Sequence, residues 1–460
     1  MTGSTRAINA PVHDRQQTRT LLVVAFGTTL ALVSFTLPLS VLGSVGAALH
    51  AGSDGQTWML SAMSLGLAAG LLACGGLGDD FGRRRVFLGG TVVFAVTSLA
   101  GAASTDALEY ALARVGQGLG AAAVIACGLG LIGHAFSEPA ARARASGVWG
   151  ASVGGGIAVG PWGAALFAGH WRLPYVLVGG FAVALVLLGR VLLTESRAAQ
   201  PHPVDVPGVV LLGGGLAALL AGLVSGRTGW MHPATVLLLA AGVLGLAGFV
   251  TVELRAAAPL LDPRLLRRPD FTAVTAAGIA TGSGIISTAS FLPTIVERGL
   301  GDGVALASLV LLVWSGVSVP VALLARRLRV DGDVQLMIGL LVVAAGQLAL
   351  YGAGSFARLL PGLVIAGVGS GVLNATLGRQ AVASVPAGRA GMGSGANNTA
   401  RYAGSGIGVT VIAVVATRPG VEGLLAGWNQ ALLVSAAFSV LGALTVLGCL
   451  QWRKHLTVSA

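Results

Sequence analysis

Charged residues are scarce in this sequence. Only 10% of its 460 residues are Asp, Glu, Lys or Arg, whereas 55% are hydrophobic and the mean hydropathy is +0.84. A soluble protein needs roughly a quarter of its residues charged to present a hydrated surface. The composition therefore excludes a soluble globular protein and predicts an all-α polytopic membrane protein, because helices satisfy their own backbone hydrogen bonds in lipid.

Cysteine and histidine are too few and too dispersed for a metal site. Cys74, Cys127 and Cys449 lie in separate apolar runs, without the spacing of a zinc site or a disulfide framework. The seven histidines fall in separate segments, and no nucleotide-binding loop is evident. We therefore expect no metal, no cofactor and no enzymatic activity. A polytopic membrane enzyme or sensor stays as the alternative from a different class, and it should gather His, Asp or Glu at one membrane surface.

The net charge of +11 does not indicate nucleic-acid binding, because the basic residues are scattered through short loops instead of being gathered on one domain.

Between these loops lie apolar segments that approach the ~20 residues needed to cross a bilayer. We expect fourteen spans, at 21–45, 56–77, 86–104, 108–133, 145–168, 173–193, 207–225, 234–252, 271–295, 304–325, 334–352, 358–378, 391–416 and 428–450.

The spans group as six, two and six. The expected parts are a cytoplasmic tail at 1–20, an N-terminal six-helix bundle at 21–193, a cytoplasmic linker at 194–206, two inserted helices at 207–252, a second cytoplasmic linker at 253–270, a C-terminal six-helix bundle at 271–450 and a cytoplasmic tail at 451–460. Most Lys and Arg then fall on one side of the membrane, which the positive-inside rule assigns to the cytoplasm. Both termini are accordingly expected inside.

An internal repeat supports two related halves packed around a central site. Residues 114–120 match residues 363–369 in their glycine spacing, and the basic loop at 83–85 has a counterpart at 326–329. The shared order of these matches predicts that the central pair of spans is inserted between the halves.

The densest cluster of glycine and charge lies between the second and third spans. It contains Gly75, Asp79, Gly82, Arg83 and Arg84. Charges so concentrated cannot lie in hydrocarbon, so we expect a tight cytoplasmic turn. A carboxylate near a helix end, with arginines beside it, can form a charge-assisted cluster that holds the two halves together on the cytoplasmic side. The alternative is that the arginines only determine topology.

A second cluster lies in the fourth span. It contains Arg114, Gln117, Gly118 and Gly120. An arginine this deep in a span should face a partner or a wet cavity, because lipid would not solvate it. The alternative is an arginine that reaches the outer surface, only two turns from Asp106 and Glu109.

A third cluster lies in the fifth span, where Gly156 and Gly160 are four residues apart on one helix face. Such glycines permit close backbone contact with a neighbouring helix. Pro161 removes a backbone donor and should bend the helix, and Gly163 follows it. A glycine packing seam without any meaning for transport is the alternative.

Polar and aromatic residues within other spans are candidates for a substrate path, since such groups in lipid generally face a cavity. These candidates are Thr29, Ser34, Trp162, Trp314, Asn374, Asn397, Asn398 and Arg401. Helix–helix hydrogen bonding is the alternative for the polar residues, and outward-facing packing is the alternative for the two tryptophans.

The three clusters resemble signatures of the major facilitator superfamily, which implies the major facilitator fold. The loop at Gly75 to Arg84 resembles its cytoplasmic gate, Arg114 to Gly120 resemble its fourth-span signature, and Gly156 to Gly163 resemble the fifth-span signature of its exporters. One departure is Asp80, where the family usually has a basic residue, and it should weaken one contact of the gate.

Fourteen spans, with the segments 203–208 and 259–266, resemble the fourteen-span drug:proton antiporter family. This resemblance implies export of a small amphipathic drug, antibiotic or secondary metabolite by alternating access, coupled to protons, from a monomer in the cell membrane. The partners are then the substrate, protons and the lipid bilayer, and no nucleic acid is expected. A metabolite importer on the same fold is the alternative.

Acidic residues are missing from the middle of every expected span. Many relatives carry an Asp nine residues before a first-span proline, but here Thr29 stands nine residues before Pro38. With only arginines as deep charges, the central cavity should be positive or neutral, and we expect neutral or anionic compounds to be exported. Proton coupling would then use a peripheral acid such as Asp106 or Glu109, or a group on the substrate.

Overall fold

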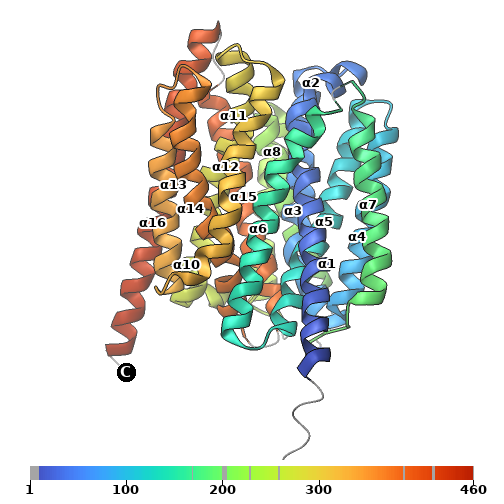
Figure 1. Ribbon diagram of the computed structural model, residues 1–460, viewed down its shortest axis with the longest axis vertical. Helices are drawn as coiled ribbons and strands as arrows, with labels where there is room; N and C mark the ends of the chain where they lie inside the picture. The colour runs from blue at the N-terminus through green and yellow to red at the C-terminus, as the bar shows by residue number, and fades with distance from the viewer. Residues whose placement is uncertain are drawn as a thin grey trace, which may run out of the picture.

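The computed structural model describes residues 10–167, 169–198, 205–226, 229–256, 259–386, 389–416 and 420–458. Within these ranges the chain is helical, with no β-strand, and the helices stand side by side in one bundle (Figure 1). The predicted tails at 1–20 and 451–460 and the predicted linker at 194–206 lie partly outside the described residues.

The first half of the chain forms the helices α1 (Ala10–Thr36), α2 (Pro38–Ala48), α3 (Ser53–Phe81), α4 (Arg83–Ala103), α5 (Ala107–Ala135), α6 (Pro139–Ala165) and α7 (Arg172–Leu192). The expected first span at 21–45 corresponds to two helices, because α1 ends at Thr36 and α2 begins at Pro38, with a break at Leu37. Pro38 has no N–H group, so it cannot donate to the carbonyl one turn earlier, and it starts α2 instead.

The rest of the chain forms α8 (Val206–Gly226), α9 (Pro233–Glu253), η1 (Pro263–Arg267), α10 (Pro269–Ala280), η2 (Thr281–Ile286), α11 (Ser287–Thr294), η3 (Ile295–Gly299), α12 (Val304–Leu324), η4 (Ala325–Arg327), α13 (Gly332–Ala349), α14 (Phe356–Ala383), α15 (Ala390–Ala416) and α16 (Gly420–Val458). In the long segment Pro269–Gly299, the π-helical turn η2 interrupts the α-helix and a second π-helical turn, η3, ends it. Such turns often mark functional positions.

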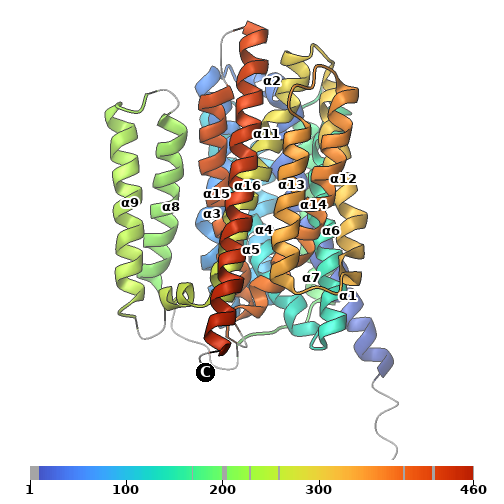
Figure 2. The same ribbon diagram turned by 90° about the vertical axis from the view of Figure 1, so that its left-hand side faces the viewer.

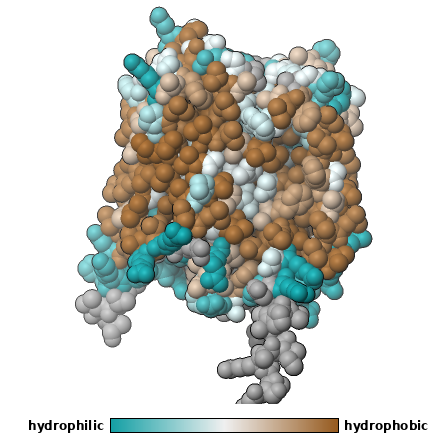
Figure 3. All heavy atoms as spheres, viewed as in Figure 1, coloured by the Kyte–Doolittle hydropathy of each residue, from teal (hydrophilic) through white to brown (hydrophobic). Residues whose placement is uncertain are grey.

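The described residues contain 13 helices that are long and apolar enough to cross a membrane. The protein is therefore a polytopic membrane protein. Figure 3 shows the corresponding surface, with a broad hydrophobic area between two hydrophilic ends. Helix α6 is also long, at 27 residues, but it is not among these 13.

Two hydrophobic cores divide the bundle. One is built mainly from α1 to α7 and the other from α10 to α16. The halves meet where α3 packs against α15 and where α6 packs against α12 and α14. Helices α8 and α9 stand at one side of the bundle (Figure 2), and α8 fills the position next to α3 and α15.

The glycines of the predicted repeat occupy equivalent packing positions in the two halves. A Cβ atom on Gly118 of α5 would lie 2.8 Å from the backbone nitrogen of Leu67 in α3, and one on Gly367 of α14 would lie 2.9 Å from Cβ of Val317 in α12. In both halves, a glycine thus lets two helices approach closely, α5 and α3 in the first half and α14 and α12 in the second.

Candidate functional site: a latch and a cavity between the halves

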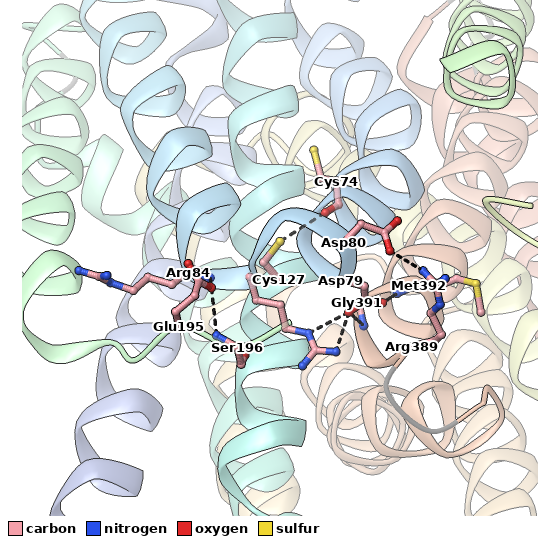
Figure 4. A network of polar contacts seen from close by, with 11 residues as sticks. Cys74, Asp79, Asp80, Arg84, Cys127, Glu195, Ser196, Arg389, Gly391 and Met392 are labelled. Atoms are coloured by element: carbon pink, nitrogen blue, oxygen red, sulfur yellow. Dashed lines mark hydrogen bonds and ion pairs between the residues drawn. The ribbon is translucent and has the colours of Figure 1, made fainter. Parts of the chain in front are cut away.

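The carboxylate of Asp79, near the end of α3, is buried and binds groups from both halves of the molecule (Figure 4). Its Oδ1 accepts a hydrogen bond of 2.8 Å from Arg83 Nε. Its two oxygens also accept bonds of 3.2 and 3.0 Å from the backbone N–H groups of Gly391 and Met392. These N–H groups belong to the first turn of α15 and have no partner within that helix. Asp79 therefore caps α15, where the helix dipole also favours a negative charge.

A second ion pair lies beside this cap. Arg389 Nη1 is 3.0 Å from Asp80 Oδ1, and the two side chains are only 19% and 13% exposed. Asp80, the departure from the family pattern, thus binds the arginine that precedes α15. We call Asp79, Asp80, Arg83 and Arg389, together with the first turn of α15, the latch.

Two of the predicted glycines are required by the geometry of the latch. Gly82 has a φ of +117°, and a Cβ atom there would lie 2.7 Å from the carboxylate of Glu195. Gly75 and Gly391 bring α3 and α15 into backbone contact, since a Cβ atom on Gly391 would lie 2.6 Å from the carbonyl oxygen of Gly75. Arg84 contacts its own half, where its backbone N–H donates to Glu195 Oε1 at 3.0 Å and its Nη2 donates to the carbonyl of Arg190 at 2.6 Å.

The segment after α9 also packs beside the latch, a contact for which no local sequence pattern exists. A Cβ atom on Gly76 of α3 would lie 2.5 Å from the side chain of Leu260. Leu260 and Leu261 pack in one hydrophobic cluster with Met392. The buried Glu253 at the end of α9 accepts a bond of 3.3 Å from the N–H of Leu261. The inserted pair of helices is thereby attached to the helices that the latch joins.

Arg114 faces protein partners, and it lines neither of the two chambers described below. It is fully buried and donates to the carbonyl of Ser34 at 2.7 Å and to that of Phe35 at 3.3 Å. In an unbroken helix the Ser34 carbonyl would accept from residue 38, but Pro38 cannot donate. Gln117 accepts a further bond of 2.8 Å from Arg114. The arginine is thus a clamp on the break between α1 and α2.

The other predicted residues around Arg114 have packing and capping positions. Gly120 brings α5 close to α4, because a Cβ atom there would lie 2.6 Å from the backbone nitrogen of Phe94. Asp106 is the N-cap of α5, and its Oδ1 accepts from the N–H groups of Leu108 and Glu109. Glu109 accepts in turn from Thr105. Both carboxylates therefore accept hydrogen bonds at the exposed N-terminal end of α5.

The glycines of α6 allow close contact with α1. A Cβ atom on Gly156 would lie 2.6 Å from the carbonyl oxygen of Thr29, and one on Gly160 would lie 2.8 Å from that of Val33. Gly163 differs, because its nearest neighbour would be Val159 at 4.0 Å. Pro161 lies inside α6, which continues to Ala165. The packing seam therefore consists of Gly156 and Gly160.

A cavity of about 480 Å³, the outer chamber, lies between the halves, and its lining includes Phe35, Gln56, Trp58, Leu220, Phe291 and Arg298. Gln56 and Trp58 begin α3, whereas the latch lies at its other end. A smaller inner chamber of about 50 Å³ is lined by residues that include Trp314, Ser370, Asn374, Arg401 and Tyr402. Phe35 and Leu39 line both chambers, so the two are adjacent.

The residues predicted for the substrate path fall into two groups, because some line the inner chamber and the others line neither chamber. Trp314, Asn374 and Arg401 line the inner chamber. The remaining predicted residues, Thr29, Ser34, Asn397, Asn398 and Trp162, line neither chamber. Trp162 is 43% exposed on α6.

The aromatic lining residues Phe35, Phe291 and Tyr402 were missed, because an apolar sequence does not tell which face of a helix meets a cavity. In the ranges that the structure describes, no group of three or more His, Cys, Asp or Glu is placed to hold a metal ion.

Comparison with known proteins gives consistent relatives. Residues 24–409 match the family profile of the Major Facilitator Superfamily. The puromycin resistance protein pur8 of Streptomyces alboniger is 33% identical over 86% of this chain and 80% of its own length. The tetracenomycin C resistance and export protein of Streptomyces glaucescens is 31% identical over 86% of this chain and 75% of its own.

Among solved structures, the human organic anion transporter MFSD10 (TETRAN) has a similar fold. Its TM-score is 0.70 at 18% sequence identity, with 94% of this chain and 99% of that chain covered.

Proposed function

Because this chain belongs to the major facilitator superfamily, we propose that it is a secondary active exporter of small amphipathic compounds, namely drugs, antibiotics or secondary metabolites, and that it works by alternating access. The observation that carries the proposal is the pairing of a closed latch at one end of the halves with a cavity toward the other end. The names of the relatives support the direction of transport and the class of compound.

We further propose a topology of fourteen spans, six, two and six, with both termini in the cytoplasm of a cell that carries the protein in its plasma membrane. In this topology α1 and α2 together form the first span, and α6 is the fifth. The latch then lies on the cytoplasmic side and the outer chamber faces outward. Each monomer would transport by itself, since the cavity lies within one chain.

The transport cycle follows from the contacts between the halves. In the outward-facing conformation, Asp79 holds the N–H groups of Gly391 and Met392, and Asp80 holds Arg389. To admit a compound from the cytoplasm, these bonds must break while α3 moves away from α15. The two conformations are then exchanged by rocking of two rigid halves, and the latch sets their relative free energies.

We propose that protons drive the export. None of the described residues that line the two chambers is acidic. The proton acceptor would therefore lie outside them, for example at Asp106 or Glu109 at the outer end of α5, or it would be a group on the substrate.

Accumulation assays across a panel of antibiotics and dyes, in cells that lack their own efflux pumps, test this function. The wild type should lower the intracellular level of at least one compound class several-fold, and Asp79→Asn at equal expression should not. Equal accumulation of every compound with wild type, variant and empty vector would contradict the proposal.

A further inference from the structure

We propose that the inner chamber is an anion-binding subsite in which Arg401 pairs with a carboxylate or phenolate of the transported compound. This inference rests on the proposed export function and names the substrate class, amphipathic organic acids with an aromatic body. It goes beyond the expectation of a neutral or positive cavity, because it assigns the charge recognition to one residue in one place.

The hydrogen bonding of Arg401 is incomplete. The side chain is 6% exposed, and the one hydrogen bond identified for its guanidinium runs from Nη2 to Asn374 Oδ1 at 3.4 Å. Its Nε is buried and has no partner. Within the described parts of the chain, no carboxylate lies within the 4.0 Å of an ion pair with Arg401. A guanidinium has five N–H donors and keeps its charge in proteins, so most of its binding capacity is unused.

The other two buried arginines have more partners in the protein. Arg83 binds the Asp79 carboxylate. Arg114, whose Nε is also without a partner, donates at 2.7–3.3 Å to two backbone carbonyls and to Gln117. Burying a cation without a counter-charge costs several kcal/mol. Since the protein supplies a partner at Arg83 and Arg114 but only one weak bond at Arg401, we infer that an anion from outside completes the site.

The groups around Arg401 suit an anionic oxygen on an aromatic compound. Trp314 Nε1 donates to Ser370 Oγ at 2.9 Å, so the Ser370 hydroxyl hydrogen is left to donate to a ligand. Tyr402 and Phe35 form an edge-to-face pair with ring centroids 5.6 Å apart where the chambers adjoin. These rings can hold an aromatic body by stacking.

The volumes of the two chambers indicate which part of the ligand each one would hold. About 50 Å³ holds one acidic group, and about 480 Å³ holds the body of a drug-sized molecule. Arg298 is the single charged residue among those that line the outer chamber in the described ranges, so the approach to Arg401 also favours anions.

Two dyes with one xanthene ring system test the subsite, namely fluorescein as the anion and rhodamine 123 as the cation. Fluorescence anisotropy with the purified full-length protein should give at least tenfold tighter binding of fluorescein. Arg401→Gln should weaken fluorescein binding at least tenfold and leave rhodamine 123 binding unchanged. Arg401→Lys, which keeps the charge, should recover part of the affinity. Arg358→Gln removes the same charge from an exposed position and should bind like the wild type.

Equal fluorescein affinity in wild type and a monodisperse Arg401→Gln would overturn the inference, as would tighter wild-type binding of rhodamine 123. Chloride is the other source of an anion. If chloride filled the site, it would neutralise Arg401 and so permit a cation to bind. Replacing chloride by gluconate would then abolish rhodamine 123 binding to the wild type but not to Arg401→Gln, and that result also contradicts the inference.

Transport in liposomes separates the two proposals. Export of rhodamine 123 that does not depend on Arg401, without export of fluorescein, would keep the exporter function and overturn the subsite. Binding of fluorescein that depends on Arg401, without movement of any compound of the panel, would overturn the exporter function and support the subsite.

Discussion

Nη1 of Arg389 lies 3.0 Å from Oδ1 of Asp80, and this ion pair joins residues that are 309 positions apart in the chain. It crosses from the end of α3 in the first half to the residue that precedes α15 in the second. The carboxylate at the position where the family usually has a basic residue therefore contributes to the closed state.

Asp80→Asn should weaken the latch by about 1 kcal/mol, the scale of a partly exposed ion pair. The fraction of molecules with an open latch would then rise about fivefold. Cys127 offers a native reporter, because it is buried behind Gly78 near the latch. In a background without Cys74 and Cys449, its labelling by a maleimide should accelerate in the variant.

The charge-reversed double variant Asp80→Arg with Arg389→Asp provides the control for that experiment. Labelling of Cys127 should return toward the wild-type rate, because the ion pair is restored with its positive and negative charges exchanged. A rate as fast as in the single variant would show that the pair does not hold the halves together.

Asp79→Asn should abolish or strongly slow transport while the protein stays in the membrane. The amide removes the charge that pairs with the buried Arg83, and breaking a buried ion pair costs about 3–5 kcal/mol. Glu422→Gln changes an exposed acid at the start of α16 and is the matched control. If Asp79→Asn transported as well as the wild type at equal expression, the role of Asp79 in the latch would be contradicted.

Gly82→Val should have a similar effect for a different reason. A valine cannot adopt the φ of +117° without strain, and its side chain would collide with Glu195. The turn between α3 and α4 should therefore shift. Transport equal to that of the wild type would contradict the requirement for glycine at this turn.

Much of this architecture could be predicted from the sequence, because apolar length and basic loops follow directly from the physics of the bilayer. The glycine repeat also carried real packing information, since Gly118 and Gly367 have equivalent neighbours. The break at Leu37 could not have been predicted from Pro38 alone, because Pro161, Pro320 and Pro361 lie inside helices that continue past them. What the sequence does not determine is which polar groups meet across the two halves.

Arg453 illustrates this limit. It belongs to the expected cytoplasmic tail at 451–460, where a basic residue indicates only the side of the membrane. In the structure it lies 3.0–3.2 Å from the carboxylates of Asp270, Asp331 and Asp333, and so joins α16 to the starts of α10 and α13. Such a cluster depends on long-range packing, which leaves no local pattern in the chain. The same holds for Leu260 against Gly76.

Gly160→Leu should be far more damaging than Val159→Leu. Position 160 faces the backbone of α1 at Val33, whereas Val159 is 46% exposed and has room for a larger side chain. Gly163→Leu should also be tolerated, because the nearest atom to its Cβ would be 4.0 Å away. Transport and thermal stability in detergent, measured for the three variants, check this order. Equal effects at positions 160 and 163 would mean that the seam is not formed by Gly160.

Arg114→Met should lower stability by about 1–3 kcal/mol, because it leaves the buried carbonyl of Ser34 without a donor. Pro38→Ala supplies an N–H group for that carbonyl. In the double variant the loss should therefore be smaller than the sum of the two single losses, as unfolding in detergent can measure. Strict additivity would argue against a clamp at the helix break.

Asn374→Asp should invert the charge preference of the cavity. The new carboxylate would stand 3.4 Å from Arg401 Nη2 and neutralise it. Fluorescein binding should fall at least tenfold while binding of rhodamine 123 is retained or improved. Thr29→Asp adds the same charge where the residue faces Ser152 of α6 and lines neither chamber, so it should not change the preference. An unchanged preference in Asn374→Asp would contradict the role of Arg401.

Export itself is tested most directly with the purified protein in liposomes under an imposed pH gradient. The compounds to use are those whose accumulation the protein lowers in cells. The wild type should move at least one of them against its concentration gradient, Asp79→Asn should not, and collapse of the pH gradient should stop the movement. No movement beyond that in protein-free liposomes, for every compound tested, would contradict the account.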